Sequence, residues 1–166
     1  MVNTMQTLKG KRALVTGGSR GIGAAVELAL AGAAADVAVN FRARSEDAEK
    51  VCVAIRKLGR RALAIQADVS QSDQVKKMVA QIEGELGAVN IVVNNAGIAR
   101  QLKIEDIEEA DWEEHISVNL KYAFLVTQAV LPQMRAQRWG ILITISSRAA
   151  QTAGVGVPHY ARSRAG

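Results

Sequence analysis

The sequence predicts a single domain built on a doubly wound parallel sheet of the α/β class, and three observations lead to this prediction. Short apolar runs alternate with longer segments in which apolar residues recur at helical spacing. Glycine or polar residues follow each short run. The 166 residues, 49% of them hydrophobic and 22% charged, are enough for one soluble domain with a sizeable core. Strands that alternate with helices form right-handed βαβ units, in which the strands are parallel.

The first short run, residues 13–15, leads directly into a glycine-rich stretch and then into a helix-patterned segment, residues 22–30. In such a strand, turn and helix, backbone N–H groups and a helix N-terminus can meet a phosphate. Gly17 permits the tight turn, Gly21 lets the backbone approach a pyrophosphate, and Gly23 lets the helix pack closely on the strand. The spacing is G-x-x-x-G-x-G rather than G-x-G-x-x-G, and a glycine turn without a ligand is the alternative.

The other elements follow from the same patterns. Helices are expected from Ser45, as an N-cap, to the stop at Gly59, along the stripe of residues 75–86, and over residues 112–135, where Pro132 should disturb the last turns. The remaining strands are predicted at residues 37–41, 62–65, 90–94 and 140–146.

Residues that can bind a ligand follow every predicted strand, and the carboxyl ends of parallel strands share one edge of the sheet. Arg42 follows the second strand, and Arg20 lies in the glycine turn. At that position an acidic residue would bind a ribose 2′-hydroxyl, whereas an arginine accommodates a 2′-phosphate. Asp36 lies at the opposite end of the strand. NADP(H) is therefore favoured over NAD(H), with a solvated surface arginine as the alternative interpretation of Arg42.

Tyr160 and Arg164 are four residues apart, which places them on one helical face. A phenol with a pKa near 10 is a poor acid–base group at neutral pH unless a nearby positive charge lowers that pKa. Ser147 precedes Tyr160 by thirteen residues and can offer a hydroxyl to a substrate carbonyl. The alternative for Tyr160 is a half-buried structural tyrosine.

The motifs at residues 16–23 (TGGSRGIG) and 94–97 (NNAG), together with Asn119, Ser147 and Tyr160, resemble those of the short-chain dehydrogenase/reductases. The resemblance runs from about Lys11 to the last residue. Within that family the sequence is most similar to the 3-oxoacyl-[acyl-carrier-protein] reductases, through residues 16–23, 40–42 and 67–70. The resemblance implies one dinucleotide-binding, Rossmann-like domain over residues 1–166, incomplete at its C-terminus.

The resemblance also implies an activity: NADPH-dependent reduction of a 3-oxoacyl thioester, or a related ketone, to the alcohol. Tyr160 would protonate the carbonyl oxygen, Ser147 would orient the carbonyl, and Asn119 would support a proton-relay water. Acyl carrier protein is the implied protein partner, and members of the family are usually homotetramers. The implied cofactor-binding residues are Gly17, Ser19, Arg20, Gly21, Ile22, Gly23, Arg42, Asp68, Val69, Asn95, Ala96 and Gly97.

The sequence departs from the family pattern in two places. Arg164 stands where the family motif has lysine. It keeps the positive charge, and its side chain could still reach the nicotinamide ribose, but the pKa of a guanidinium is too high for it to relay a proton. The chain also ends at Gly166, whereas members of the family continue with further strands and a substrate loop. Residues 141–143 would then form an uncovered apolar edge prone to aggregation. An inactive or impaired fragment that retains a dinucleotide-binding half is therefore the alternative function.

Composition argues against several other classes of function. The net charge of +5 comes from scattered bases, and only 4% of residues are aromatic, so no nucleic-acid partner is expected. No apolar run is long enough to span a membrane, and residues 1–8 lack the apolar core of a secretory signal, so a cytoplasmic location is expected. Cys52 is expected in the core. His115 and His159 are interpreted as surface or packing residues, and no metal site is expected.

Overall fold

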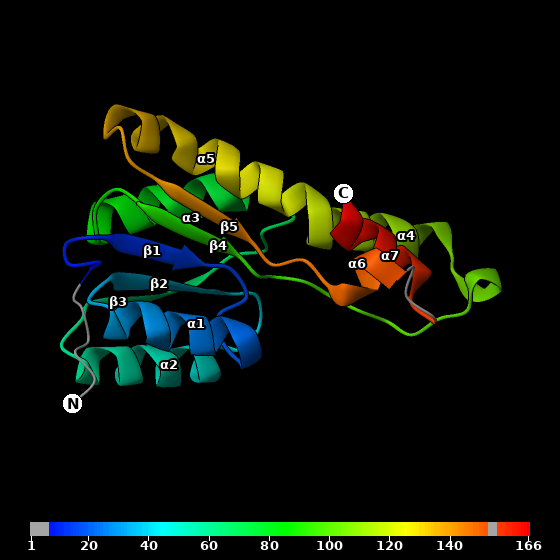
Figure 1. Ribbon diagram of the computed structural model, residues 1–166, viewed down its shortest axis with the longest axis horizontal. Helices are drawn as coiled ribbons and strands as arrows, with labels where there is room; N and C mark the ends of the chain where they lie inside the picture. The colour runs from blue at the N-terminus through cyan, green and yellow to red at the C-terminus, as the bar shows by residue number, and fades with distance from the viewer. Residues whose placement is uncertain (1–6, 153–155) are drawn as a thin grey trace.

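The computed structural model describes residues 7–152 and 156–166, so most of the N-terminal segment used to judge export lies outside the described residues. Five parallel strands form one sheet in the order β3-β2-β1-β4-β5, which confirms the predicted doubly wound fold (Figure 1). The strands are β1 (Arg12–Val15), β2 (Asp36–Phe41), β3 (Ala62–Gln66), β4 (Ile91–Asn94) and β5 (Ile141–Thr144). The helices are α1 (Gly21–Gly32), α2 (Ser45–Lys57), α3 (Ser72–Glu85), η1 (Ile104–Asp106), α4 (Glu109–Ile116), η2 (Ser117–Lys121), α5 (Tyr122–Ala136), α6 (Arg148–Thr152) and α7 (Pro158–Ala165).

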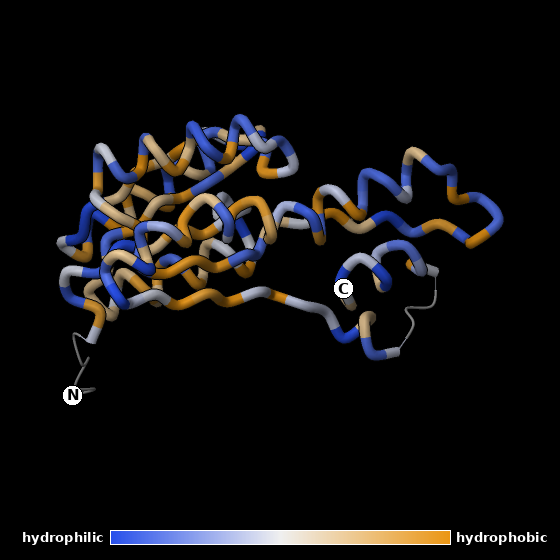
Figure 2. Tube along the Cα trace, turned by 90° about the horizontal axis from the view of Figure 1, so that it is seen from above, coloured by the Kyte–Doolittle hydropathy of each residue, from blue (hydrophilic) through white to orange (hydrophobic). Residues whose placement is uncertain are grey.

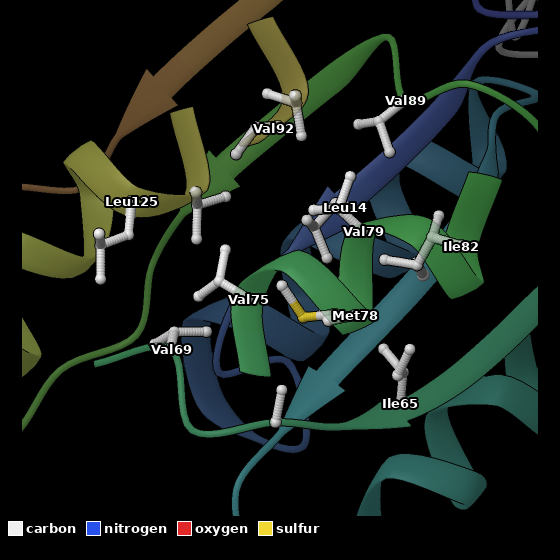
Figure 3. Close-up of a cluster of buried hydrophobic side chains, with 14 of the residues drawn as sticks. Leu14, Ile65, Val69, Val75, Met78, Val79, Ile82, Val89, Val92 and Leu125 are labelled. Atoms are coloured by element: carbon white, nitrogen blue, oxygen red, sulfur yellow. The ribbon is translucent and has the colours of Figure 1, made fainter. Parts of the chain in front are cut away.

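Helices cover both faces of the sheet, with α1 and α2 on one side and α3 and α5 on the other (Figure 1). Leu14 pairs in register with Ala38 and Val92, and all three face the cluster under α3 and α5. Side chains of that cluster interdigitate between α3, α5 and the strands (Figure 3). The alternate residues of β1, Ala13 and Val15, face the α1 side. Burial on both faces explains why these strands are almost uninterrupted apolar runs.

The prediction of one long helix over residues 112–135 is wrong in one respect, because the structure divides this segment into three helical elements. It begins as α4, passes through the π-helical turn η2, and continues as α5 to Ala136. Pro132 does not interrupt the last turns of α5, which continues to Ala136. Proline has no N–H to donate to the carbonyl of Gln128, but both residues are exposed, so water can bind that carbonyl instead. Ser45 is also not an N-cap but the first residue of α2, and it makes no capping hydrogen bond.

Beyond the carboxyl ends of the strands, α4, α6 and α7 form a small group of helices (Figure 1). His115 on α4 and His159 on α7 are fully buried there, with ring centroids 3.9 Å apart in an edge-to-face arrangement. They are therefore packing residues and not surface residues. Burial, and next the neighbouring His115, lower the pKa of His159. Cys52 is buried in the core, as expected.

The strand β5 lies at one edge of the sheet, where Ile141, Leu142 and Ile143 are 41%, 42% and 43% exposed. The expectation of an exposed apolar edge is confirmed, and Figure 2 shows the corresponding apolar run along the border of the molecule, leading into α6. None of the described helices is long and apolar enough to cross a membrane.

Candidate functional site

A cavity of about 540 Å³ lies at the carboxyl ends of β1 to β4, where the sequence analysis expects a ligand. All the predicted cofactor-binding residues except Gly23 contribute to its wall. The lining consists of Gly17, Ser19, Arg20, Gly21, Ile22, Asn40, Arg42, Ala43, Arg44, Ala67, Asp68, Val69, Asn95, Ala96, Gly97, Ile98 and Val118. The carboxyl ends of four strands therefore meet at one concave surface that combines polar and apolar groups.

The glycine-rich turn has the backbone that its sequence requires. Gly17 and Gly21 have φ of +66° and +58°, a region that residues with a β-carbon rarely adopt, and a β-carbon on Gly21 would meet no atom within 4 Å. Gly23 is buried, and a β-carbon there would lie 2.6 Å from the Gly17 carbonyl oxygen. Gly23 thus packs closely against the backbone of the turn and does not line the cavity, in agreement with the close packing expected for it.

Three polar side chains hold the turn against its neighbours. The Asn40 side-chain oxygen accepts a hydrogen bond from the Gly17 N–H at 3.3 Å, and its amide donates to the Ala67 carbonyl at 3.1 Å. The Thr16 hydroxyl accepts from the Asn95 N–H at 3.0 Å, while the Asn95 amide donates to the Thr16 carbonyl at 2.9 Å. Because these partners come from β2 and from the residues that directly follow β1, β3 and β4, the turn is fixed before any ligand arrives.

Three exposed arginines line the cavity together. Arg20 belongs to the glycine-rich turn, and Arg42 and Arg44 belong to the segment between β2 and α2. Asp36 lies at the far end of β2, where its carboxylate pairs with Arg60 at 2.9 Å. Guanidinium groups in this place suit a phosphate, because they bind it through two parallel hydrogen bonds.

Asp68 and Val69 form the wall contributed by the chain after β3. The Asp68 carboxylate accepts hydrogen bonds from the Ser70 N–H at 3.0 Å and the Ser70 hydroxyl at 2.7 Å. The same carboxylate oxygen takes both bonds, so Asp68 stabilises its own turn and still presents its other oxygen. It is a turn residue and a lining residue at once.

Asn119 lies in the π-helical turn η2, a kind of turn found often at functional sites. Its side-chain oxygen accepts from the Ile98 N–H at 2.8 Å, and its amide donates to the Ile98 carbonyl and to the Ser163 hydroxyl, each at 2.9 Å. The Ser163 hydroxyl in turn donates to the Tyr160 carbonyl at 2.8 Å. Both amide hydrogens of Asn119 are thus engaged, so the proton-relay role predicted for Asn119 would have to use its remaining acceptor capacity.

Tyr160 and Ser147 lie beyond the cavity, Tyr160 on α7 and Ser147 directly before α6. Tyr160 is half-buried on α7, and α6 packs against α7. The Ser147 hydroxyl accepts from the Ala149 N–H at 3.2 Å at the start of α6. Neither residue is part of the cavity wall. Their catalytic roles stay predictions.

Arg164 projects inward between the ends of β4 and β5. Its guanidinium donates to the Ile145 carbonyl and to the Ala96 carbonyl, each at 3.0 Å, and a β-carbon on Gly97 would overlap it. Its carbon Cζ lies 5.8 Å from the centroid of the Tyr160 ring, as spacing on one helical face predicts. The guanidinium therefore binds backbone carbonyls, whereas the sequence analysis expects it to be available to a ribose.

Sequence reasoning did not identify three residues of this region. Arg44 lines the cavity two positions after Arg42, and Ser163 joins Asn119 to α7. Glu27 is fully buried on α1 against Gly18, and burial raises the pKa of its carboxyl to about 9. A charged residue within the apolar pattern of residues 22–30, four positions after Gly23, is the signal that could have found Glu27.

The family model for short chain dehydrogenases matches residues 11–166. The chain is 39% identical over 156 residues to the 3-oxoacyl-[acyl-carrier-protein] reductase FabG of Staphylococcus epidermidis and 40% identical over 156 residues to that of Staphylococcus aureus. It covers 64% and 63% of those proteins, and 94% of it is aligned in both cases. The crystal structure of a short-chain type dehydrogenase/reductase from Mycobacterium marinum superposes with a TM-score of 0.92 and 39% identity, over 99% of this chain and 68% of that one. The chain therefore belongs to the short-chain dehydrogenase family of oxidoreductases.

Proposed function

We propose that this chain is the dinucleotide-binding part of an NADP(H)-dependent reductase that converts a 3-oxoacyl thioester, or a related ketone, into the alcohol. The observation that carries the cofactor preference is the cavity at the glycine-rich turn, which is lined by Arg20 from that turn and by Arg42 and Arg44 from the segment between β2 and α2. The substrate class rests on the names of the relatives, and the chain spans less than two thirds of the two staphylococcal proteins.

The residues present fit such a cofactor in its phosphate-bearing half. The turn offers backbone N–H groups and the N-terminus of α1 to the pyrophosphate, and Asp68 and Val69 offer a wall to the adenine. When bound, the nicotinamide supplies the hydride. Tyr160 would give a proton to the carbonyl oxygen, and Ser147 would hold that oxygen with its hydroxyl, so that donors are in place where negative charge develops. Acyl carrier protein is the proposed bearer of the thioester.

A second function is favoured by the position of Arg164. Its guanidinium is bonded to two backbone carbonyls, and an arginine cannot relay a proton at neutral pH. A chain that binds the dinucleotide but reduces a ketone slowly or not at all is the alternative that this arrangement supports.

Binding and turnover measurements separate these functions. Titration calorimetry with NADPH and NADH tests the cofactor: we expect tighter binding of NADPH, and about ten-fold weaker NADPH binding in Arg42→Ala because a charged hydrogen bond is lost. Arg135→Ala, an exposed arginine on α5, is the matched control. Equal affinities for the two nucleotides in the unaltered chain would contradict the NADP(H) preference.

Oxidation of NADPH in the presence of an acetoacetyl thioester then tests the reaction. Turnover that rises strongly in Arg164→Lys supports a reductase impaired by its arginine. Nucleotide binding without turnover in either chain supports the alternative of a dinucleotide-binding chain that is not catalytic.

A further inference from the structure

The carboxyl group of Glu27 lies directly behind the glycine-rich turn. Glu27 is on α1, it is 0% exposed, and a β-carbon on Gly18 would overlap its Oε1 atom. Gly18 itself is buried, with its N–H donated to the Asn40 carbonyl at 2.8 Å, and its neighbours Gly17 and Ser19 line the cavity. Only the thickness of the turn therefore separates this carboxyl from the proposed phosphate position.

Neither oxygen of the Glu27 carboxyl has a hydrogen-bond partner among residues 7–152 and 156–166. A buried carboxylate without a partner or a counter-charge is costly, so the group is held as the neutral acid. Burial alone raises its pKa to about 9, and no cation contributes to that shift.

The groups that face Glu27 from neighbouring elements do not change this conclusion. On α2 the relevant group is Cys52, whose pKa is raised to about 11, first by burial, then by Glu49, with Glu27 as a smaller contribution. On the turn itself Arg20 is exposed, and the adjoining Thr16 and Asn40 are neutral. Glu27 therefore ionises before Cys52 as the pH rises.

We propose that Glu27 makes nucleotide binding at this turn depend on a proton, because the ligand's pyrophosphate is held more tightly while the carboxyl behind Gly18 is uncharged. This inference rests on the proposed function of the cavity and adds a positioning residue to it. Ionisation of Glu27 would place a negative charge next to bound phosphate, at a distance where one charge across a protein interior changes affinity on the order of ten-fold. By linkage, bound nucleotide would in turn favour the protonated acid.

Calorimetric titration of the chain with NADPH and with ADP between pH 6 and 10 tests the proposal. In the unaltered chain we expect affinity for both nucleotides to fall about ten-fold or more as Glu27 ionises near pH 9, and in Glu27→Gln we expect that fall to disappear. Glu109→Gln, which removes an exposed carboxylate of α4, and Cys52→Ala should retain it. The same pH dependence in the unaltered chain and Glu27→Gln overturns the proposal while leaving the proposed function intact. No binding of either nucleotide at any pH overturns both.

A second measurement does not depend on the variant folding. Carbon NMR of the unaltered chain, labelled at its glutamate carboxyls, should show one carboxyl that titrates near pH 9 and whose pKa rises further when ADP is added. A set of carboxyls that all titrate in the ordinary range would overturn the proposal, as would a high pKa that ADP does not shift.

Discussion

The carboxyl of Glu27 also predicts how the stability of the fold depends on pH. Its pKa is raised from 4.5 to about 9 by burial, so between these values the folded chain holds a proton that the unfolded chain has lost. Folding takes up that proton, and the free energy of unfolding must fall as the pH rises through this window. The two and a half pH units between 4.5 and 7, at about 1.4 kcal/mol each, lower the free energy of unfolding by about 3 to 4 kcal/mol at neutral pH.

Replacement of Glu27 by glutamine removes the titration and keeps the size of the side chain. We expect the difference in unfolding free energy, variant minus unaltered chain, to grow by about 1.4 kcal/mol for each pH unit between pH 6 and 8, in favour of Glu27→Gln. Urea unfolding followed by circular dichroism at several pH values measures it, and groups that titrate equally in both chains, such as His159, cancel in the difference. A difference that stays constant from pH 6 to 8 would refute the reasoning, because the carboxyl would then not be held neutral by the fold.

Three further predictions follow from other parts of the structure. Gly97→Ala should lower the free energy of unfolding by about 1–3 kcal/mol, because the new β-carbon would overlap the guanidinium of Arg164, which is bonded to the Ala96 carbonyl. In an Arg164→Ala background this loss of stability should be smaller. Losses that simply add in a double-mutant cycle would contradict this position of Arg164. Leu142→Lys on the exposed edge strand β5 should reduce self-association in light scattering. Leu58→Lys should not, although Leu58, at the end of α2, is even more exposed than Leu142. Equal effects of the two substitutions would show that the edge strand is not the surface through which chains associate. Because the pKa of His159 is lowered in the folded chain, the unfolded chain takes up a proton on this residue at a higher pH than the folded chain does. The free energy of unfolding should therefore decline as the pH falls below about 6.5. His159→Phe should show a smaller decline in the same urea titrations. An unchanged decline in that variant would assign the effect to other groups.

The turn at residues 16–23 shows how much of the site local sequence can predict. The positive φ of Gly17 and Gly21 and the close approach at Gly23 follow from the glycines themselves, since only a residue without a β-carbon accepts those conformations and contacts. Arg42 and Asp68 were expected at the carboxyl ends of strands, and both line the cavity, because parallel strands bring all such ends to one edge. The π-helical turn around Asn119 was missed, because its helical periodicity continues on both sides and nothing local marks a change of hydrogen-bond spacing.

The alternation of apolar runs with helix-patterned segments was by itself enough to determine the layered α/β fold, because each run must be covered on both faces and each helix must bury one stripe. The sequence also determined that a glycine-rich turn follows the first strand and that arginine, not a carboxylate, follows the second strand. The tertiary structure alone decided where long side chains point. In an amphipathic helix a charged residue such as Glu27 is normally expected on the solvent side, yet the packing of α1 behind the turn buries it. Arg164 keeps the charge of the family's lysine, yet the carbonyls of Ala96 and Ile145, from strand ends far apart in the sequence, hold its guanidinium. Such contacts depend on which distant backbone atoms meet, and no local pattern of residues contains that information.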